Sequence, residues 1–528
     1  SLKISELESN FRRLSENSGI FSETDTEIIL SGEFSKIEEV VSVESLSEMS
    51  LLSQVSSGTS GGFAINEDEN INYMKNNPNL NLTGRNVIIA IADTGIDYLH
   101  PDFINADGTS KILYLWDQTK EGNSPEGFYF GTEYTRDDIN RAISENDSTL
   151  STDEVGSGTL LSGICAGLGV SNSLYEGVAK DSELIVIKLG TIDGKYNNAY
   201  YYVARDYARK KARELERPLI INTSVGTNSD VGFINRATQS TIWYQYGECE
   251  IAGIGNEGNT QTHASGKISS SGETQTVEIE IEEEEEFLKI ELWICRPDRV
   301  NIKIISPTGE ESKDVGLGYY KKESGIFNFE NTTYAVFYVF PTSYSGQEFI
   351  TINLYNASPG VWKINLTGVY INSGCYNVYL PNRSLINQNT RFLEPDPFYT
   401  VNFPTVDRNI FTVGAYDMIN NSMWPPSSRG PNIRNIQKPN IVAPGVNIIS
   451  AYPHNRYGNI TGTSAAAAVT SGVAALFLQY VTQNNQYKRQ GFTQSIYSFF
   501  QLGADREDNI QYPNFIYEIG RASCRERV

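Results

Sequence analysis

Short, continuous apolar runs mark the first and last parts of the chain. Four of them have the length of buried strands and lie at residues 87–93, 184–189, 219–224 and 250–254. Residues 199–215 have a helical pattern, as expected for the crossover between two parallel strands. The pattern therefore predicts an α/β core built on a parallel sheet, with helices on both faces.

A different pattern begins near residue 266. Apolar and polar residues alternate at period two in five segments, at residues 277–281, 288–294, 300–304, 350–354 and 362–371. Such alternation is typical of antiparallel strands with one face in water, and turn signals such as Ser306-Pro-Thr-Gly309 separate the segments. We predict an antiparallel β-sandwich over residues 266–394, inserted into the α/β core.

Five consecutive glutamates, Glu282–Glu286, lie between the first two of these strands. Carboxylates suit calcium, so the run could be a calcium site. Five adjacent like charges repel one another and cannot all converge on one ion. We therefore favour a solvated hairpin tip and predict no metal site.

The strongest chemical signal is Gly462-Thr-Ser-Ala-Ala466, which leads into a small, apolar run that ends at Leu478. The run predicts a buried helix. Ser464 at its start would lie where unpaired backbone N–H groups and the helix dipole favour developing negative charge. An ordinary N-cap serine is the alternative for this motif taken alone.

Two predicted strands end in polar residues that suit catalysis. The strand at 87–93 ends in Asp93, followed by Thr-Gly, and the strand at 250–254 is followed by Gly-Asn256-Glu-Gly. A carboxylate at the carboxyl end of a parallel strand projects into a cleft. An Asx-turn is the structural alternative for Asp93. An amide at Asn256 could donate to an oxyanion.

The segment Asp153-Glu-Val-Gly-Ser-Gly-Thr-Leu-Leu-Ser-Gly163 completes a set of four motifs. Taken in order, the four resemble the Asp, His, Asn and Ser motifs of the subtilisin-like serine proteases (subtilases). The resemblance implies a subtilisin-like fold, with Asp93 as the triad acid, Ser464 as the nucleophile and Asn256 in the oxyanion hole. The position of the triad histidine holds Ser157.

Other segments resemble the Csp-type subtilases, which are known from spore germination in anaerobic spore-formers. The resemblance implies a jelly-roll insertion and an edge strand at Ser224, Val225 and Gly226 that pairs with an extended peptide. It rests on Leu113-Tyr-Leu-Trp-Asp-Gln-Thr, Tyr129-Phe-Gly-Thr-Glu-Tyr-Thr-Arg-Asp-Asp-Ile and Ile221-Asn-Thr-Ser-Val-Gly-Thr, with shorter matches at Leu82 and Leu184.

A serine at position 157 cannot take the proton of Ser464, because a general base needs a pKa near neutrality. We therefore predict a chain that is inactive as a protease and acts as a binding or regulatory pseudoprotease in germination. Rescue by His263 near the cleft, or by an imidazole from the substrate, would restore chemistry; His100 fits a structural turn. The alternative function is a working serine endopeptidase that processes a spore protein zymogen through Ser464.

These observations divide the chain into six regions. Region boundaries follow the shifts in composition, and the first region resembles a shortened subtilase prodomain. The regions are 1–52 (prodomain-like), 53–79 (a Ser/Gly-rich linker), 80–265 (first part of the core), 266–394 (insertion), 395–520 (second part of the core) and 521–528 (a tail that we interpret as an artefact of cloning or of the sequence end).

The composition excludes some classes of binding partner. The formal net charge of −22 argues against nucleic acid and anionic membranes. We expect a protein or peptide partner in an extended conformation, the chain's own prodomain, and no cofactor. No apolar run reaches the roughly 18 residues of a membrane span. The chain opens at Ser1 without a signal-peptide pattern, and family resemblance suggests a spore-associated or extracytoplasmic location.

The cysteines and histidines are too scattered to predict a scaffold. The five cysteines show no Cys-x-x-Cys pair, so we predict neither a disulfide framework nor a zinc site, with Cys165 packed in the core. The three histidines are not spaced for zinc.

Overall fold

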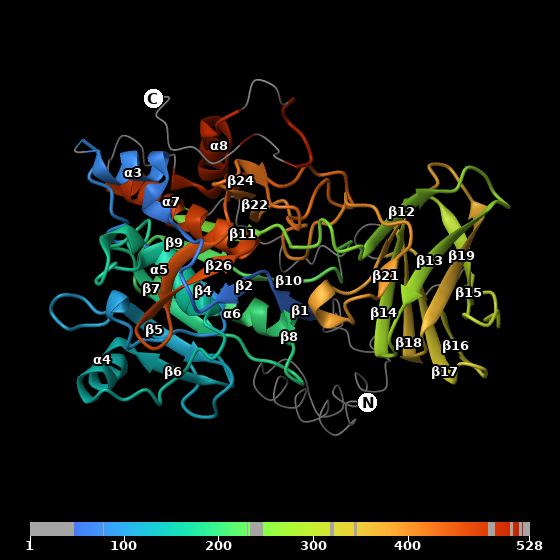
Figure 1. The fold of residues 1–528 in the computed structure, drawn as a ribbon, viewed down its shortest axis with the longest axis horizontal. Helices are drawn as coiled ribbons and strands as arrows, with labels where there is room; N and C mark the ends of the chain where they lie inside the picture. Colours follow the sequence, from blue (N-terminus) through green and yellow to red (C-terminus); the bar gives the residue numbers. More distant parts are fainter. Residues whose placement is uncertain are drawn as a thin grey trace.

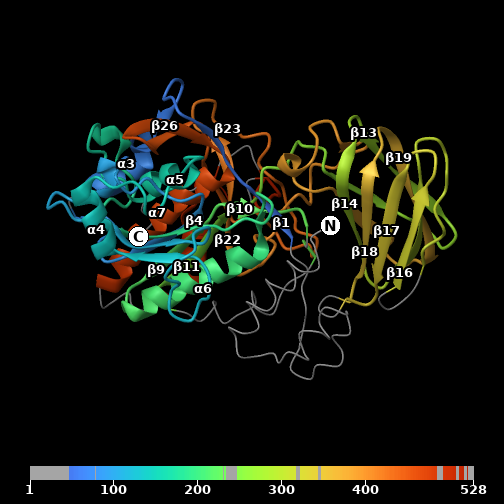
Figure 2. The same ribbon diagram turned by 90° about the horizontal axis from the view of Figure 1, so that it is seen from below.

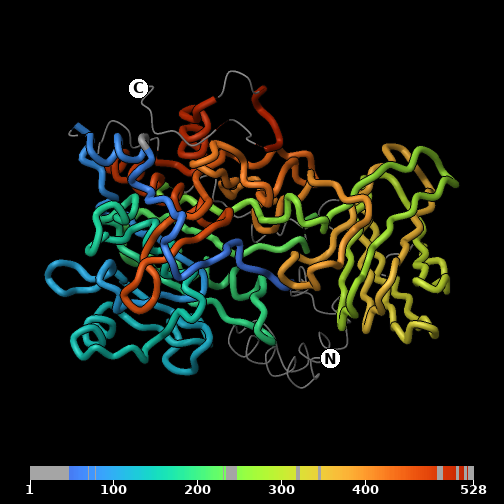
Figure 3. The backbone as a smooth tube through the Cα atoms, viewed as in Figure 1, coloured from blue at the N-terminus to red at the C-terminus, as the bar shows by residue number. Residues whose placement is uncertain are grey.

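The computed structural model consists of a large α/β core and an insertion that forms a separate lobe beside it (Figures 1 and 3). It describes residues 47–77, 79–229, 231–232, 246–316, 321–342, 346–483, 491–506, 511–516 and 520. Most of the prodomain-like region and all of the tail at 521–528, including Cys524, lie outside the described residues.

A nine-stranded sheet forms the centre of the core, in the order β23-β22-β11-β9-β4-β7-β5-β6, with β24 also paired to β22. All pairs are parallel except the two terminal ones, β22 with β23 and β5 with β6. The predicted parallel sheet is therefore confirmed. The strands are β4 (Ile88–Asp93), β5 (Ile112–Asp117), β6 (Thr132–Thr135), β7 (Glu183–Lys188), β9 (Leu219–Thr223), β11 (Glu248–Gly253), β22 (Phe411–Asp417), β23 (Ser422–Met423) and β24 (Ile441–Pro444).

Helices cover both faces of this sheet, because successive residues of its central strand face opposite ways. Ile89 and Ile91 of β4 pack with α5 (Ser157–Ala166) and α7 (Thr463–Gln483). Ile88 and Ala90 pack on the other face, with α6 (Asn198–Glu214). Figure 2 shows α6 and α7 on opposite sides of the sheet. The shorter α3 (Glu69–Asn76), α4 (Arg136–Glu145) and α8 (Thr493–Gly503) lie at the periphery.

Helix α7 is apolar and long enough, by length and composition alone, to cross a membrane, which the sequence prediction did not anticipate. In the structure 83% of its apolar window is buried. Its alanines pack against the central sheet in the apolar core that also contains α5. The composition of α7 is therefore explained by burial inside the protein.

The insertion consists of two antiparallel sheets around one apolar core, as the alternating pattern predicts. One sheet has the order β12-β20-β14-β18-β17-β16 and the other β15-β19-β13-β21. The strands are β12 (His263–Lys267), β13 (Thr274–Ile281), β14 (Glu285–Ile294), β15 (Arg299–Ile305), β16 (Lys321–Phe327), β17 (Thr332–Val339), β18 (Glu348–Ala357), β19 (Gly360–Tyr370), β20 (Cys375–Tyr379) and β21 (Arg391–Phe392).

The glutamate run does not form the predicted hairpin tip, because β13 and β14 belong to different sheets. Glu282–Glu284 and Glu286 are exposed, as expected for a solvated run. Glu285 is buried, and its carboxylate accepts hydrogen bonds from Thr390 Oγ1 (2.5 Å) and Asn387 N (2.9 Å). The run is thus the crossover between two sheets, with one carboxylate fixed by a neighbouring loop.

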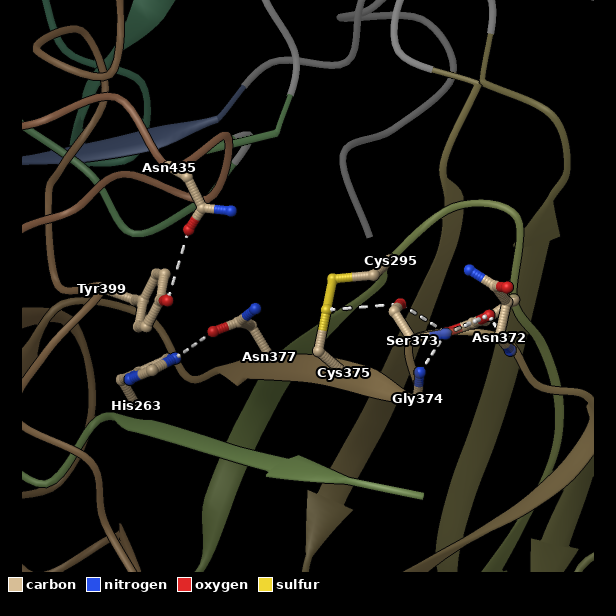
Figure 4. Close-up of a disulfide and its surroundings, with 10 residues drawn as sticks. His263, Cys295, Asn372, Ser373, Gly374, Cys375, Asn377, Tyr399 and Asn435 are labelled. Atoms are coloured by element: carbon tan, nitrogen blue, oxygen red, sulfur yellow. Dashed lines mark hydrogen bonds between the residues drawn. A yellow bond between two sulfur atoms is a disulfide. The ribbon is translucent and has the colours of Figure 1, made fainter. Parts of the chain in front are cut away.

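One disulfide corrects the expectation from the cysteine spacing. Cys295 and Cys375 are joined, with their Cα atoms 5.4 Å apart (Figure 4). They extend the antiparallel pairing of β14 with β20, in which Ile294 lies opposite Tyr376. Cys165 and Cys249 are free and buried, as predicted for Cys165.

Residues 53–79 are not the linker that their Ser/Gly content suggests. They contain β2 (Gln54–Ser56), β3 (Phe63–Ala64), the 3₁₀ helix η2 (Ile65–Glu67) and α3. The first two strands flank the hairpin β25 (Ile448–Tyr452) and β26 (Arg456–Thr461), in the sheet order β2-β26-β25-β3. Backbone pairing therefore fixes this segment although its side chains are small and polar.

Candidate active-site cleft

Helices α5 and α7 begin beside the carboxyl end of β4, and Ser157, Ser464 and Asp93 lie at the ends of these three elements. Gly462 precedes α7 with a φ of 152°, and a Cβ at this position would lie 2.1 Å from Leu52 O. Glycine is therefore needed where the backbone of residues 52–53 approaches the start of the helix.

Ser464 lies in the first turn of α7 and is fully buried. Its N–H and its hydroxyl both donate to Leu52 O, at 3.2 Å and 2.8 Å. Asn256, in the loop after β11, accepts from Thr463 N (3.1 Å) and Thr463 Oγ1 (2.9 Å) through its Oδ1 atom. The structure thus places Ser464 and Asn256 at the same helix end, with Ser464 on the Leu52 carbonyl and Asn256 on Thr463.

Asp93 ends β4 and is fully buried. Its carboxylate accepts from Thr94 N (2.7 Å) and from the Ser224 hydroxyl, and Ser157 also hydrogen-bonds to it. Burial raises the pKa of Asp93 to about 6, although these hydrogen bonds act in the opposite direction. Only hydroxyl and backbone N–H groups oppose this rise in pKa, and no cationic side chain does.

Ser157 is the first residue of α5, after Gly156 with a φ of 88°. Its hydroxyl lies between the Asp93 carboxylate and the Ser53 hydroxyl, whose Oγ atom is 3.0 Å from Ser157 Oγ. The triad histidine position therefore carries a buried hydroxyl that bridges Asp93 to the chain's own residue 53.

A second carboxylate, Asp153, anchors the start of α5. It accepts from Thr94 Oγ1 (2.6 Å) and Gly156 N (2.7 Å), and from both the backbone N–H (2.8 Å) and the hydroxyl (2.6 Å) of Thr159. Thr94 Oγ1 in turn accepts from Gly158 N at 3.0 Å. This network ties α5 to the end of β4 without involving Ser157.

The cleft is filled by the chain itself. Strand β1 (Glu48–Leu51) pairs antiparallel with β10 (Val225–Gly226) on one side and with β8 (Tyr196–Asn197) on the other (Figure 1). Ser50 lies opposite Gly226. The strand predicted to bind an extended peptide is thus paired with residues 50–51, and β8 with residues 48–49.

The chain continues through the cleft in both directions. Leu52 N donates to Ser224 O at 2.8 Å, and Gln54–Ser56 then pair with β26. The peptide bond between Leu52 and Ser53 therefore passes directly over Ser464, with paired strands before and after it.

Among the residues that the structure describes, none of the three histidines hydrogen-bonds to Ser464 or Asp93. His263 lies in β12, where Nδ1 is 3.0 Å from Asp396 O and Nε2 is 3.0 Å from Asn377 Oδ1 (Figure 4). His100 Nε2 is 2.9 Å from Arg456 O, consistent with its predicted structural role. His454 is exposed, and its backbone N–H donates to Asp97. The structure thus gives no support to rescue by His263.

No group of three or more His, Cys, Asp or Glu side chains suited to a metal occurs among the residues that the structure describes. The arrangement can still present a peptide carbonyl to a serine hydroxyl and to N–H donors.

Several residues of the cleft escaped sequence reasoning. Leu52 and Ser53 have no motif, and Tyr196–Asn197 form a strand of two residues. Thr94 and Asp153 lie inside quoted motifs, so the polar residues around Ser157 could have indicated the network. Asn382, whose Nδ2 atom donates to Ser50 Oγ, had no signal in the sequence.

Comparisons with known proteins agree with this geometry. The Subtilase family profile (Peptidase S8) matches residues 84–282 and 382–496, which is more than half of the chain. The CspB protease of Clostridium perfringens has a similar structure, with a TM-score of 0.79, 25% identity and coverage of 87% of this chain and 95% of that chain.

Curated relatives match shorter segments. Serine protease AprX of Bacillus subtilis is 37% identical over 100 residues, 15% of this chain and 23% of the relative. Subtilisin of Bacillus sp. (strain TA39) is 30% identical over 194 residues, 36% of this chain and 39% of the relative. The chain thus spans less than half the length of these relatives. The family match and the likeness to CspB show that the chain belongs to the subtilase family, and to its Csp-type group.

Proposed function

We propose that this protein is a pseudoprotease, a subtilase homologue that binds an extended segment in its cleft without cleaving it. The observation that carries the proposal is the hydrogen-bonding of Ser464. Its hydroxyl donates to Leu52 O, the carbonyl that it would attack, and its recorded partners include no base. The neighbouring Ser157 cannot remove the proton.

The state of Asp93 supports the same proposal. In a working triad, a buried aspartate orients the histidine and stabilises the imidazolium that forms. Here Asp93 contacts only hydroxyl and backbone N–H groups, and its pKa is raised. It therefore lacks the partner that would give it a catalytic role.

An intact segment in the cleft is the expected consequence. Residues 48–52 and 54–56 are held by backbone pairing on both sides of the bond that faces Ser464. Without a general base this bond persists, and the prodomain-like region stays attached. We propose that the closed cleft serves regulation through binding, in spore germination as the Csp-type resemblance implies.

The test measures the bond between Leu52 and Ser53. The purified full chain is incubated for days at pH 8, its mass is followed, and Ser464 is probed with a fluorophosphonate. We expect an intact chain and no labelling. Cleavage at this bond, or labelling that Ser464→Ala abolishes, would contradict the proposal.

Ser157→His sharpens the test. An imidazole beside Asp93 should raise the rate of cleavage at residues 52–53 by at least about 100-fold, since general acid–base catalysis contributes about 10²–10⁴-fold. Ser157→Asn is the matched control, because it adds a polar side chain without a base and should leave the bond intact. The double variant Ser157→His/Ser464→Ala should also stay intact.

The second candidate is the working endopeptidase that processes a spore protein zymogen. It is favoured by one observation, the carbonyl of Leu52 placed against both the hydroxyl and the N–H of Ser464. That candidate requires the unmodified chain to cleave a peptide, and the same labelling experiment decides between the two.

A further inference from the structure

We propose that Asn382 is a specificity-determining residue of the cleft, which selects a segment with a hydroxyl side chain at the position of Ser50. The inference rests on the proposed use of the cleft for binding and names what it binds. Asn382 Nδ2 donates to Ser50 Oγ at 2.6 Å. Ser50 lies two residues before Leu52, the residue whose carbonyl faces Ser464.

Asn382 lies in the insertion, in the loop between β20 and β21 and directly after Leu380-Pro381. Its side chain is fully buried. The insertion therefore does more than pack beside the core, because its β20–β21 loop contributes a hydrogen-bond donor to Ser50 and to Gly226 O.

The amide of Asn382 can adopt one orientation only. Its Oδ1 atom accepts from Asn228 N at 2.6 Å, and a backbone N–H cannot accept a bond in return. The Nδ2 atom must therefore face the other way, toward Ser50 Oγ and toward Gly226 O at 3.0 Å. The donor offered to the bound segment is fixed before the segment binds.

Further buried amides hold this donor in place. Asn402 Nδ2 donates to Asn228 Oδ1 at 2.7 Å, and Asn228 Nδ2 donates to Leu380 O at 3.2 Å. Asn228 and Asn402 are 1% and 0% exposed. A donor held this rigidly cannot turn away when the bound segment offers no acceptor.

Because the hydrogen bond between Asn382 and Ser50 is buried, it selects which residue the cleft accepts at position 50. Ser50 is only 7% exposed and sits opposite Gly226 in the β1–β10 pair. An apolar residue there would bury an N–H without its partner, and a lysine would place a donor against a donor. The side chain of Leu52 instead packs closely against Gly226, where an added Cβ would lie 3.2 Å from both Leu52 methyl carbons. This position therefore favours an apolar residue.

The predicted ligand class is therefore an extended segment with a small hydroxyl residue, then any residue, then a bulky apolar residue. Leu51 between them is only half-buried, so it is the tolerant position. The chain's own residues 50–52 satisfy this pattern.

Hydrogen–deuterium exchange on the full chain tests the assignment, with the amides of residues 48–52 as the readout. Ser50→Ala should speed their exchange about 5–10-fold and Ser50→Val more, because each leaves the buried amide of Asn382 short of one acceptor. Ser56→Ala makes the same chemical change at an exposed serine of the same segment and should change exchange less than 2-fold.

A double-variant cycle separates recognition from general loosening. In an Asn382→Ala background, Ser50→Ala should have no further effect on exchange. Equal exchange in Ser50→Ala, Ser50→Val and Ser56→Ala would overturn the inference, as would an undiminished effect in the Asn382→Ala background. If Asn382→Ala does not fold, the Ser50 series alone decides.

Mass measured on the same samples keeps the two proposals apart. A chain that is intact but insensitive to Ser50 substitutions overturns only the role of Asn382. A chain cut between Leu52 and Ser53 overturns the proposed function.

Discussion

The starts of α5 and α7 meet at the same cleft, but they differ in which residues of a protease site they carry. At α7, Ser464 donates its hydroxyl and its N–H to the Leu52 carbonyl, and Asn256 accepts from the preceding Thr463. At α5, the catalytic side chain is absent, whereas the Asp153 network that fixes the helix is complete. The residue that fixes the start of α5, Asp153, is therefore separate from the residue at the histidine position, Ser157.

The largest effect is expected when Asp153, the residue that anchors the start of α5, is replaced. Asp153→Ala leaves two backbone N–H groups and two hydroxyls buried without their acceptor. We expect a loss of about 3–5 kcal/mol in the free energy of unfolding. Urea denaturation measures it, with Ser157→Ala as the control at the same helix end. Similar losses in both variants would show that the anchor and the histidine position are not separate.

The second prediction concerns Asp93, the buried carboxylate that has no imidazole beside it. The folded-state pKa of Asp93 is about 6 against an ordinary 3.8, so the stabilisation from its proton is complete below pH 4 and is lost as pH rises through about 6. Asp93→Asn should therefore stabilise the protein at pH 8 by roughly 2–3 kcal/mol, at about 1.4 kcal/mol per pKa unit, with almost no gain at pH 4.

Urea unfolding at the two pH values checks this prediction. Asp193→Asn removes the same charge at an exposed site and corrects for the acidity of the chain. A gain that is equal at pH 4 and pH 8 would contradict the raised pKa.

The smallest effect is expected at the nucleophile itself. Ser464→Ala removes one hydrogen bond to Leu52 O, which keeps the Ser464 N–H, so we expect a loss of about 1 kcal/mol in stability. Ser162→Ala is a matched control, since that buried hydroxyl has no hydrogen-bond partner in the structure. Equal changes in the two variants would mean that Ser464 does not hold the segment.

Local patterns made much of the core predictable. Asp93 ends a strand, Asn256 follows one and Ser464 begins a helix, each with an unambiguous apolar pattern, and parallel pairing brings the two strand ends to one edge of the sheet. The pairing of Ser50 with Gly226 could not be predicted, because a strand of two residues has no periodicity. The Cys295–Cys375 disulfide was missed because its partners are 80 residues apart, in strands of similar pattern.

The glutamate run illustrates a different limit. Its charge correctly predicted exposure of most members. It could not show that β13 and β14 belong to different sheets, because strand partners depend on the whole topology of the insertion. Sequence patterns thus predicted which residues meet water more reliably than which strands meet each other.

The strands on both sides of Leu52 give the cleft a very high effective concentration of its own occupant. A tethered segment competes as though it were present at about millimolar concentration when its connection is short. Here both connections are short, since β1 precedes the peptide bond at Leu52 and β2 follows it. A free peptide of equal affinity would therefore need millimolar concentrations to enter, whereas one cut in this segment would make the cleft responsive to far more dilute ligands.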